Sequence, residues 1–116
     1  MADDLFGGEQ AEEEADDLFD ALRSELAIAL AAFADEQDVD DDFLSFLLLD
    51  AAVTQRALAY ALGTEKPSEG GLKIEFDRFG RAFGELLREA KKQARPMLAH
   101  LRQTIAEAEQ AADDET

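Results

Sequence analysis

The sequence contains no cysteine, only two prolines and a single histidine. Without cysteine the chain has no disulfide framework, no thiolate nucleophile and no cysteine-based metal site, so its stability must come from packing. Basic residues are also scarce: 11 Lys and Arg stand against 28 Asp and Glu, which gives a net charge of −17. A field this negative repels phosphate backbones and anionic lipid surfaces. We therefore expect no cofactor and no direct nucleic-acid contact, and the composition points to no specific small-molecule ligand.

A long hydrophobic run is absent as well. Spanning a bilayer takes roughly 18 or more consecutive apolar residues, and no run in this sequence approaches that length. Residues 1–10 carry acids where a secretory signal carries Lys or Arg. We expect a cytoplasmic protein that does not bind membranes.

The chain does contain enough apolar material to build a core. Apolar residues make up 47% of its 116 residues, and a chain of this length forms one domain. Its apolar positions recur every three or four residues, as they do in amphipathic helices. We predict an all-α fold, an antiparallel bundle of three or four helices over residues 12–110. A flexible acidic tail at residues 1–11 and a frayed acidic tail at residues 111–116 flank it.

Two helices are predicted in the first half of the chain. The first begins near Glu12, and its apolar stripe consists of Leu18, Leu22, Leu26, Leu30 and Phe33. The second covers about residues 42–62 and is apolar on nearly every side, so we expect it to be central and buried. Residues 64–72 contain Pro67 and two glycines and are predicted to form the longest loop.

The third helix is predicted to start near Asp77. It follows an alternation of Leu72, Ile74 and Phe76, which we interpret as a loop anchor because a single short strand has nothing to pair with. Pro96 falls inside the apolar series, lacks a backbone donor and clashes with the preceding turn. It should therefore kink this helix or begin a fourth one.

A continuous third helix of some 35 residues would be about 50 Å long, well beyond its neighbours. Its far half then needs a cover. Either Pro96 folds the chain back, or a second chain packs there as a homodimer. The candidate dimer seam consists of Met97, Leu98, Leu101 and Ile105.

Charge is segregated along the chain. Residues 1–42 hold sixteen acids against Arg23 alone, a net of −15, whereas residues 73–102 hold eight bases against four acids, a net of +4. Four arginines repeat every seven residues and form a candidate basic stripe: Arg81, Arg88, Arg95 and Arg102. They pair either with Glu85, Glu89 and the acids of the first helix in the same molecule, or with the acidic face of a second copy or another acidic partner.

The pentapeptide ADDLF occurs at residues 2–6 and again at residues 15–19. The second copy belongs to the apolar stripe of the first helix. The first copy places Leu5 and Phe6 on the acidic tail, where they form a candidate docking motif for an apolar groove with a basic rim. Alternatively, Leu5 and Phe6 fold back on the domain as a hydrophobic staple or stay loose.

One acidic segment begins like a calcium loop but does not continue as one. Asp38, Asp40 and Asp42 give the D-x-D-x-D start, yet Phe43 and Leu49 stand where the loop requires Gly and a bidentate Glu. We therefore predict no metal site.

The only histidine, His100, has the chemistry of a phospho-acceptor or a general base. No helical His-Glu metal motif and no Ser or Cys nucleophile setting accompanies it, so we predict no catalytic residue.

The leading functional hypothesis is a non-catalytic protein–protein interaction or regulatory module, with a protein partner or a second copy. One alternative is an acidic mimic that occupies the nucleic-acid-binding surface of a basic protein. Another is a phosphotransfer domain or other enzyme centred on His100. The acid excess is typical either of a salt-adapted, halophilic protein or of an ordinary acidic protein with solubilising ends.

Overall fold

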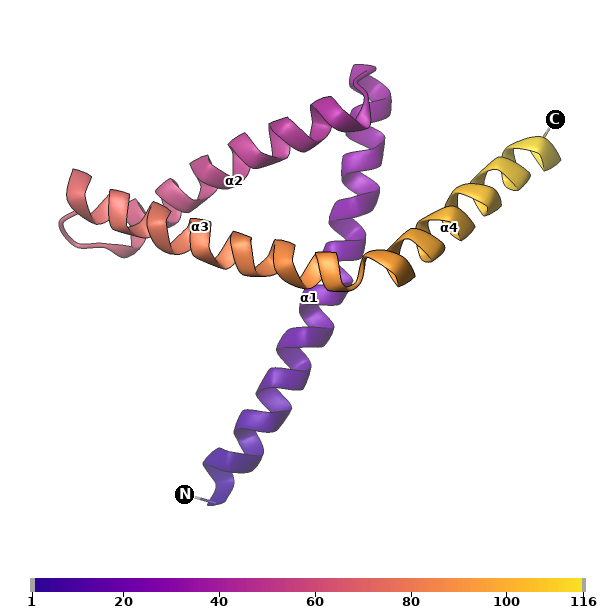
Figure 1. The fold of residues 1–116 in the computed structure, drawn as a ribbon. Helices are drawn as coiled ribbons and strands as arrows, with labels where there is room; N and C mark the ends of the chain where they lie inside the picture. The colour runs from indigo at the N-terminus through magenta and orange to yellow at the C-terminus, as the bar shows by residue number, and fades with distance from the viewer. Residues whose placement is uncertain (1, 116) are drawn as a thin grey trace. The chain divides into compact units, whose positions relative to one another are not determined.

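Helices joined by short connections make up the described chain. The computed structural model describes the backbone of residues 2–115 and the side chains of residues 11–114. Over this part of the chain it contains four α-helices and no strand, which follow one another in the order shown in Figure 1. The predicted all-α class is confirmed, and of the three or four helices predicted the described residues form four.

The first helix, α1, spans Ala2–Gln37. It begins earlier than the expected start near Glu12, so residues 2–11 form its first turns, and the flexibility of that segment stays a prediction. The helix ends at Asp38, whose φ of 54° is left-handed. The next amide, that of Val39, donates a hydrogen bond to the Ala34 carbonyl at 3.0 Å, which satisfies one of the last carbonyls of α1.

The second helix, α2, spans Asp41–Gly63, close to the predicted bounds. The Asp40 carboxylate accepts a hydrogen bond from the Phe43 amide at 2.8 Å and so caps the helix. Asp41 and Asp42 lie in its first turn, where the helix dipole favours negative charge. Asp40, Asp41 and Asp42 therefore all favour the start of α2 at this point of the chain.

The third helix, α3, spans Glu69–Lys92, so the predicted start near Asp77 is wrong. The supposed loop anchor of Leu72, Ile74 and Phe76 lies inside this helix, and the loop shortens to residues 64–68. Ser68 is the physical reason. Its backbone is extended and its hydroxyl accepts a hydrogen bond from the Gly71 amide at 3.0 Å, a cap worth about 1 kcal/mol, which offsets the cost of one glycine in the first turn.

The fourth helix, α4, spans Ala94–Glu115 and follows α3 after Gln93 alone. Gln93 has non-helical dihedrals, with φ −97° and ψ 11°. Pro96 lies in the first turn of α4, where an amide hydrogen has no partner within the helix. Of the two outcomes predicted for Pro96, the one that begins a fourth helix is confirmed. Residues 111–115 belong to α4. Helix bounds do not report motion, so the fraying predicted for residues 111–116 stays a prediction.

The chain divides by its internal contacts into two units, Met1–Ala51 (unit 1) and Ala52–Thr116 (unit 2). Unit 1 contains α1 and the first part of α2, and unit 2 contains the rest of α2 with α3 and α4. The boundary falls inside a continuous helix, whereas domain boundaries normally fall in exposed linkers. The single domain over residues 12–110 therefore stays a prediction.

Neither unit, taken by itself, buries any of its described side chains. Leu22, Leu47 and Phe83, three of the residues expected inside the bundle, are 53%, 40% and 39% exposed. The expectation that α2 is buried is likewise wrong for the single chain. Periodicity identifies which face of a helix is apolar, but it does not identify the surface that covers that face.

Candidate functional site

The best-defined contacts between helices lie within unit 2, where α2 ends and α3 begins. The Tyr60 hydroxyl accepts a hydrogen bond from the Ser68 amide at 3.1 Å. Gly71 lies against the same ring, and a Cβ at this position would collide with the Tyr60 hydroxyl. We call these three residues the α2–α3 corner. At this corner the Tyr60 hydroxyl binds the residue before α3, and Gly71, which has no side chain, lets α3 approach the Tyr60 ring closely.

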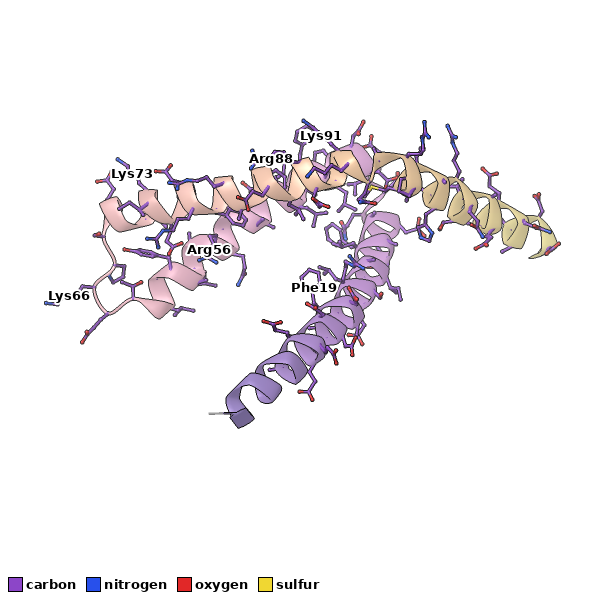
Figure 2. The ribbon with its side chains drawn as sticks, turned by 60° about the horizontal axis from the view of Figure 1, so that its bottom comes forward. Phe19, Arg56, Lys66, Lys73, Arg88 and Lys91 are labelled. Atoms are coloured by element: carbon purple, nitrogen blue, oxygen red, sulfur yellow. The ribbon has the colours of Figure 1, made fainter. Side chains whose placement is uncertain are left out.

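An ion pair between α2 and α3 reinforces this junction. A guanidinium nitrogen of Arg56 lies 3.1 Å from a carboxylate oxygen of Glu75 on α3, and Arg78 lies 3.8 Å from the other oxygen of the same carboxylate. Glu75 is the more enclosed partner, with a side chain 19% exposed against 44% for Arg56. Figure 2 places Arg56 at this junction of α2 and α3. Two arginines share one carboxylate, which leaves a local excess of positive charge.

Beside this pair lies a shallow groove of about 290 Å³, lined by Ala52, Gln55, Arg56, Ala59 and Phe79. A second hollow of about 270 Å³ adjoins it and is lined by Arg56, Glu75, Arg78, Phe79 and Ala82. The charged groups along both hollows are the three that already pair with one another. The groove therefore presents an apolar floor with a basic rim and offers contact surface rather than acid–base chemistry.

The structure divides the basic stripe between two helices, with Arg81 and Arg88 on α3 and Arg95 and Arg102 on α4. All four are exposed. The ion pairs among the described residues are Arg23 with Asp20, Arg56 and Arg78 with Glu75, Lys73 with Glu69, and Lys92 with Glu89. None includes the basic stripe, so the expected pairing with Glu85 and Glu89 does not occur. Figure 2 shows Arg88 and Lys91 near the end of α3, with Lys73 near its start.

All four residues of the candidate dimer seam lie on α4, which brings them to one face of a single helix. Met97, Leu98, Leu101 and Ile105 are 48%, 48%, 47% and 57% exposed. The other described contacts of this part of α4 are local, such as the bond from the Thr104 hydroxyl to the His100 carbonyl at 3.0 Å. Within unit 2 the seam is thus an uncovered apolar strip, and its pairing with a second chain stays a prediction.

The acids of α1 form the other charged surface. Glu12, Glu13, Glu14, Asp16 and Asp17 are all exposed. Within the described part of α1, the one ion pair joins Arg23 and Asp20, at 3.2 Å. The side chains of Leu5 and Phe6, the candidate docking motif, lie outside the described residues.

The residues weighed for chemistry are scattered. His100 is exposed on α4, and the Asp40 carboxylate is engaged as a helix cap. Among the described side chains, no group of three or more His, Cys, Asp or Glu residues is arranged to hold a metal ion.

By length and composition alone, one described helix, α2, is long and apolar enough to cross a membrane. The prediction of no membrane binding rested on the absence of a long uninterrupted apolar run, and Asp50 and Arg56 interrupt the apolar residues of α2. Each charge costs about 2.5–3.5 kcal/mol at the centre of a bilayer on insertion scales, and Arg56 is joined to Glu75 on α3. We therefore keep the prediction that the chain does not bind membranes.

The residues that join α2 to α3 were not identified from the sequence; they are Tyr60, Ser68, Gly71, Arg56 and Glu75. A signal existed for Ser68, because serine is a preferred cap residue and Glu69 follows it in the first turn of the helix. The others depend on which helices meet, and no local pattern carries that information. Comparisons with protein-family models, with curated proteins and with solved structures found no match to this chain.

Proposed function

We propose that this chain is a non-catalytic, cytoplasmic protein–protein interaction module that self-associates. The observation supporting this is that its helices carry apolar residues at core spacing, yet neither unit by itself buries any described side chain. Burying one Leu or Phe is worth about 1.5–3 kcal/mol. Uncovered faces of this kind mark surfaces that close against another protein, and a second copy supplies a surface of the same chemistry.

Sedimentation equilibrium, combined with circular dichroism over a hundredfold range of protein concentration, tests this proposal. A self-associating module shows a mass above 12.7 kDa and a melting midpoint that rises with concentration, because association stabilises the folded state by mass action. A strictly monomeric chain with a cooperative melt independent of concentration would overturn self-association.

A second candidate is the acidic mimic, and the exposed, largely unpaired acids of α1 favour it. Salt separates it from self-association. Two copies that each carry −17 repel one another, so raising salt strengthens their association by shortening the Debye length from about 10 Å at 0.1 M to about 3 Å at 1 M. Binding to a basic surface weakens over the same range.

The mimic is tested directly by competition. A labelled DNA duplex bound to a homeodomain is titrated with the chain at 0.05 M and 0.3 M KCl, and fluorescence anisotropy follows release of the duplex. The mimic predicts release at low salt that is lost at high salt. Anisotropy unchanged at both salt concentrations would remove this candidate.

Salt adaptation is a separate proposal that rests on the same acid excess. It predicts that the melting midpoint climbs as KCl rises to molar concentration, because screening relieves self-repulsion among the carboxylates. A midpoint that stays level or drops over this range would remove it.

A further inference from the structure

Two helices each carry an apolar stripe bordered by unpaired charge, and the charges are opposite in sign. On α4 the stripe is the seam, and Arg95 and Arg102 border it. At about 100° of rotation per helical residue, both arginines project within about 60° of Leu98. Both are exposed and neither is among the ion pairs of the described residues.

On α1 the stripe runs through Leu18, Leu22 and Phe33, all well exposed. Glu14, Glu25 and Glu36 follow one another at eleven-residue steps, which is close to three helical turns, so they fall within about 40° of one another along one edge of that stripe. These three acids are exposed, and none of them is in an ion pair with a described base. We call Glu14, Glu25 and Glu36 the acidic edge of α1.

We propose that a second copy of this chain covers the α4 seam with its own α1, so that the acidic edge of α1 faces Arg95 and Arg102. This inference rests on the proposed function and names the surfaces that meet. Apolar stripes then bury one another while charged edges set register and orientation, as flanking charges do in coiled coils.

Charge complementarity is the reason for pairing α1 with α4, and the self-association proposed above is the reason for assigning that α1 to a second copy. A like pairing of α1 with α1 would bring two acidic edges together, and a like pairing of α4 with α4 would leave the acidic edges unpaired. The pairing of α1 with α4 satisfies both signs. In a two-fold dimer it occurs twice, so one kind of contact covers both seams and both α1 stripes.

A charge-swap mixing experiment tests the pairing. One chain carries Arg95→Glu and Arg102→Glu, and the other carries Glu14→Arg and Glu25→Arg. Alone, each chain places like charges across every proposed contact, so its self-association should weaken at least tenfold. Mixed in equal amounts, the two chains restore opposite charges at both contacts. Sedimentation velocity with one chain fluorescently labelled should then show mixed dimers at close to wild-type affinity.

A matched control carries Glu13→Arg and Asp17→Arg. It makes the same change in charge on α1, but about 140–180° from Leu22 and so away from the stripe. It should neither weaken its own association to the same degree nor form preferred mixed dimers with the chain carrying Arg95→Glu and Arg102→Glu.

Other results overturn the pairing in distinguishable ways. If mixing fails, but all four substitutions in one chain restore its wild-type melt, then the chain's own α1 covers the seam. If the wild type associates and neither swap weakens it, the charged edges do not meet and only this inference fails. A wild type that stays monomeric at all concentrations removes the proposed function itself.

Discussion

The α2–α3 corner and α4 differ in the contacts that they make with other helices. At the corner, α2 and α3 contact each other through the Tyr60 hydroxyl, the Ser68 cap and the missing side chain of Gly71. Along α4 the side-chain hydrogen bonds are local, such as the one between Gln103 and Glu107 at 3.2 Å, and the seam is uncovered. The difference teaches that this chain specifies its own hairpin with a few polar atoms, whereas no comparable contact within unit 2 covers the seam on α4.

The largest effect is expected at the seam. Leu98→Asp with Leu101→Asp removes two leucines, each worth about 1.5–3 kcal/mol when buried, so self-association should weaken by about 100-fold or more at 1.4 kcal/mol per tenfold. Light scattering measures the change. His100→Asp with Gln103→Asp is the control on the polar side of α4 and should keep wild-type affinity. Equal loss in both variants would place the interface elsewhere.

At the corner, Gly71→Ala should destabilise the folded chain by about 1–3 kcal/mol, because the added Cβ overlaps the Tyr60 hydroxyl and forces a shift. Gly70→Ala is the matched control, since a Cβ there meets nothing within 4 Å and alanine is favoured over glycine in a helix by up to about 1 kcal/mol. Urea unfolding at fixed protein concentration measures both. If the two variants lose stability equally, the contact between Tyr60 and Gly71 is absent in solution.

Ser68→Ala should cost about 1 kcal/mol, because the Gly71 amide loses its cap at the start of α3. Ser24→Ala provides the control, since the Ser24 hydroxyl bonds only to the Asp20 carbonyl within the same helix, and alanine is the better helix former there. Urea midpoints compare the two. A Ser68→Ala chain as stable as the wild type would argue that α3 begins later than Glu69.

The smallest effect is expected at the ion pair. Glu75→Gln should cost about 1 kcal/mol or less, because Glu75 is partly enclosed between Arg56 and Arg78. Glu69→Gln, which breaks the fully open pair with Lys73, should cost less than about 0.5 kcal/mol. Thermal melts at 0.05 M and 1 M KCl compare the loss of stability in the two variants. If Glu69→Gln is the more damaging, the junction of α2 and α3 does not depend on Glu75.

The helices themselves could be predicted from the sequence. The recurrence of apolar residues predicted α2 to within about one residue at each end, 42–62 against Asp41–Gly63. Pro96 marked the start of α4 because the chemistry of a missing amide is local. These elements were predictable because each depends on a few neighbouring residues.

The errors came from information that the local sequence does not contain. Gly70 and Gly71 were assigned to a loop, although Ser68 caps a helix that includes both. Gly71 is glycine because of Tyr60, which lies in another helix. The exposure of Leu22, Leu47 and Phe83 could not be predicted, since the spacing of apolar residues is the same whether the cover comes from the same chain or from a second one.

Pro96 has a further consequence for how this surface is presented. One continuous helix through α3 and α4 would measure about 70 Å at 1.5 Å per residue. The apolar residues of both helices would then lie along a single straight axis. Pro96 and the non-helical dihedrals of Gln93 divide this length into two helices of about 36 and 33 Å. The break at Gln93 therefore separates the axis of α4 from that of α3, so the direction of the seam is set by residues 93–96 and not by the corner.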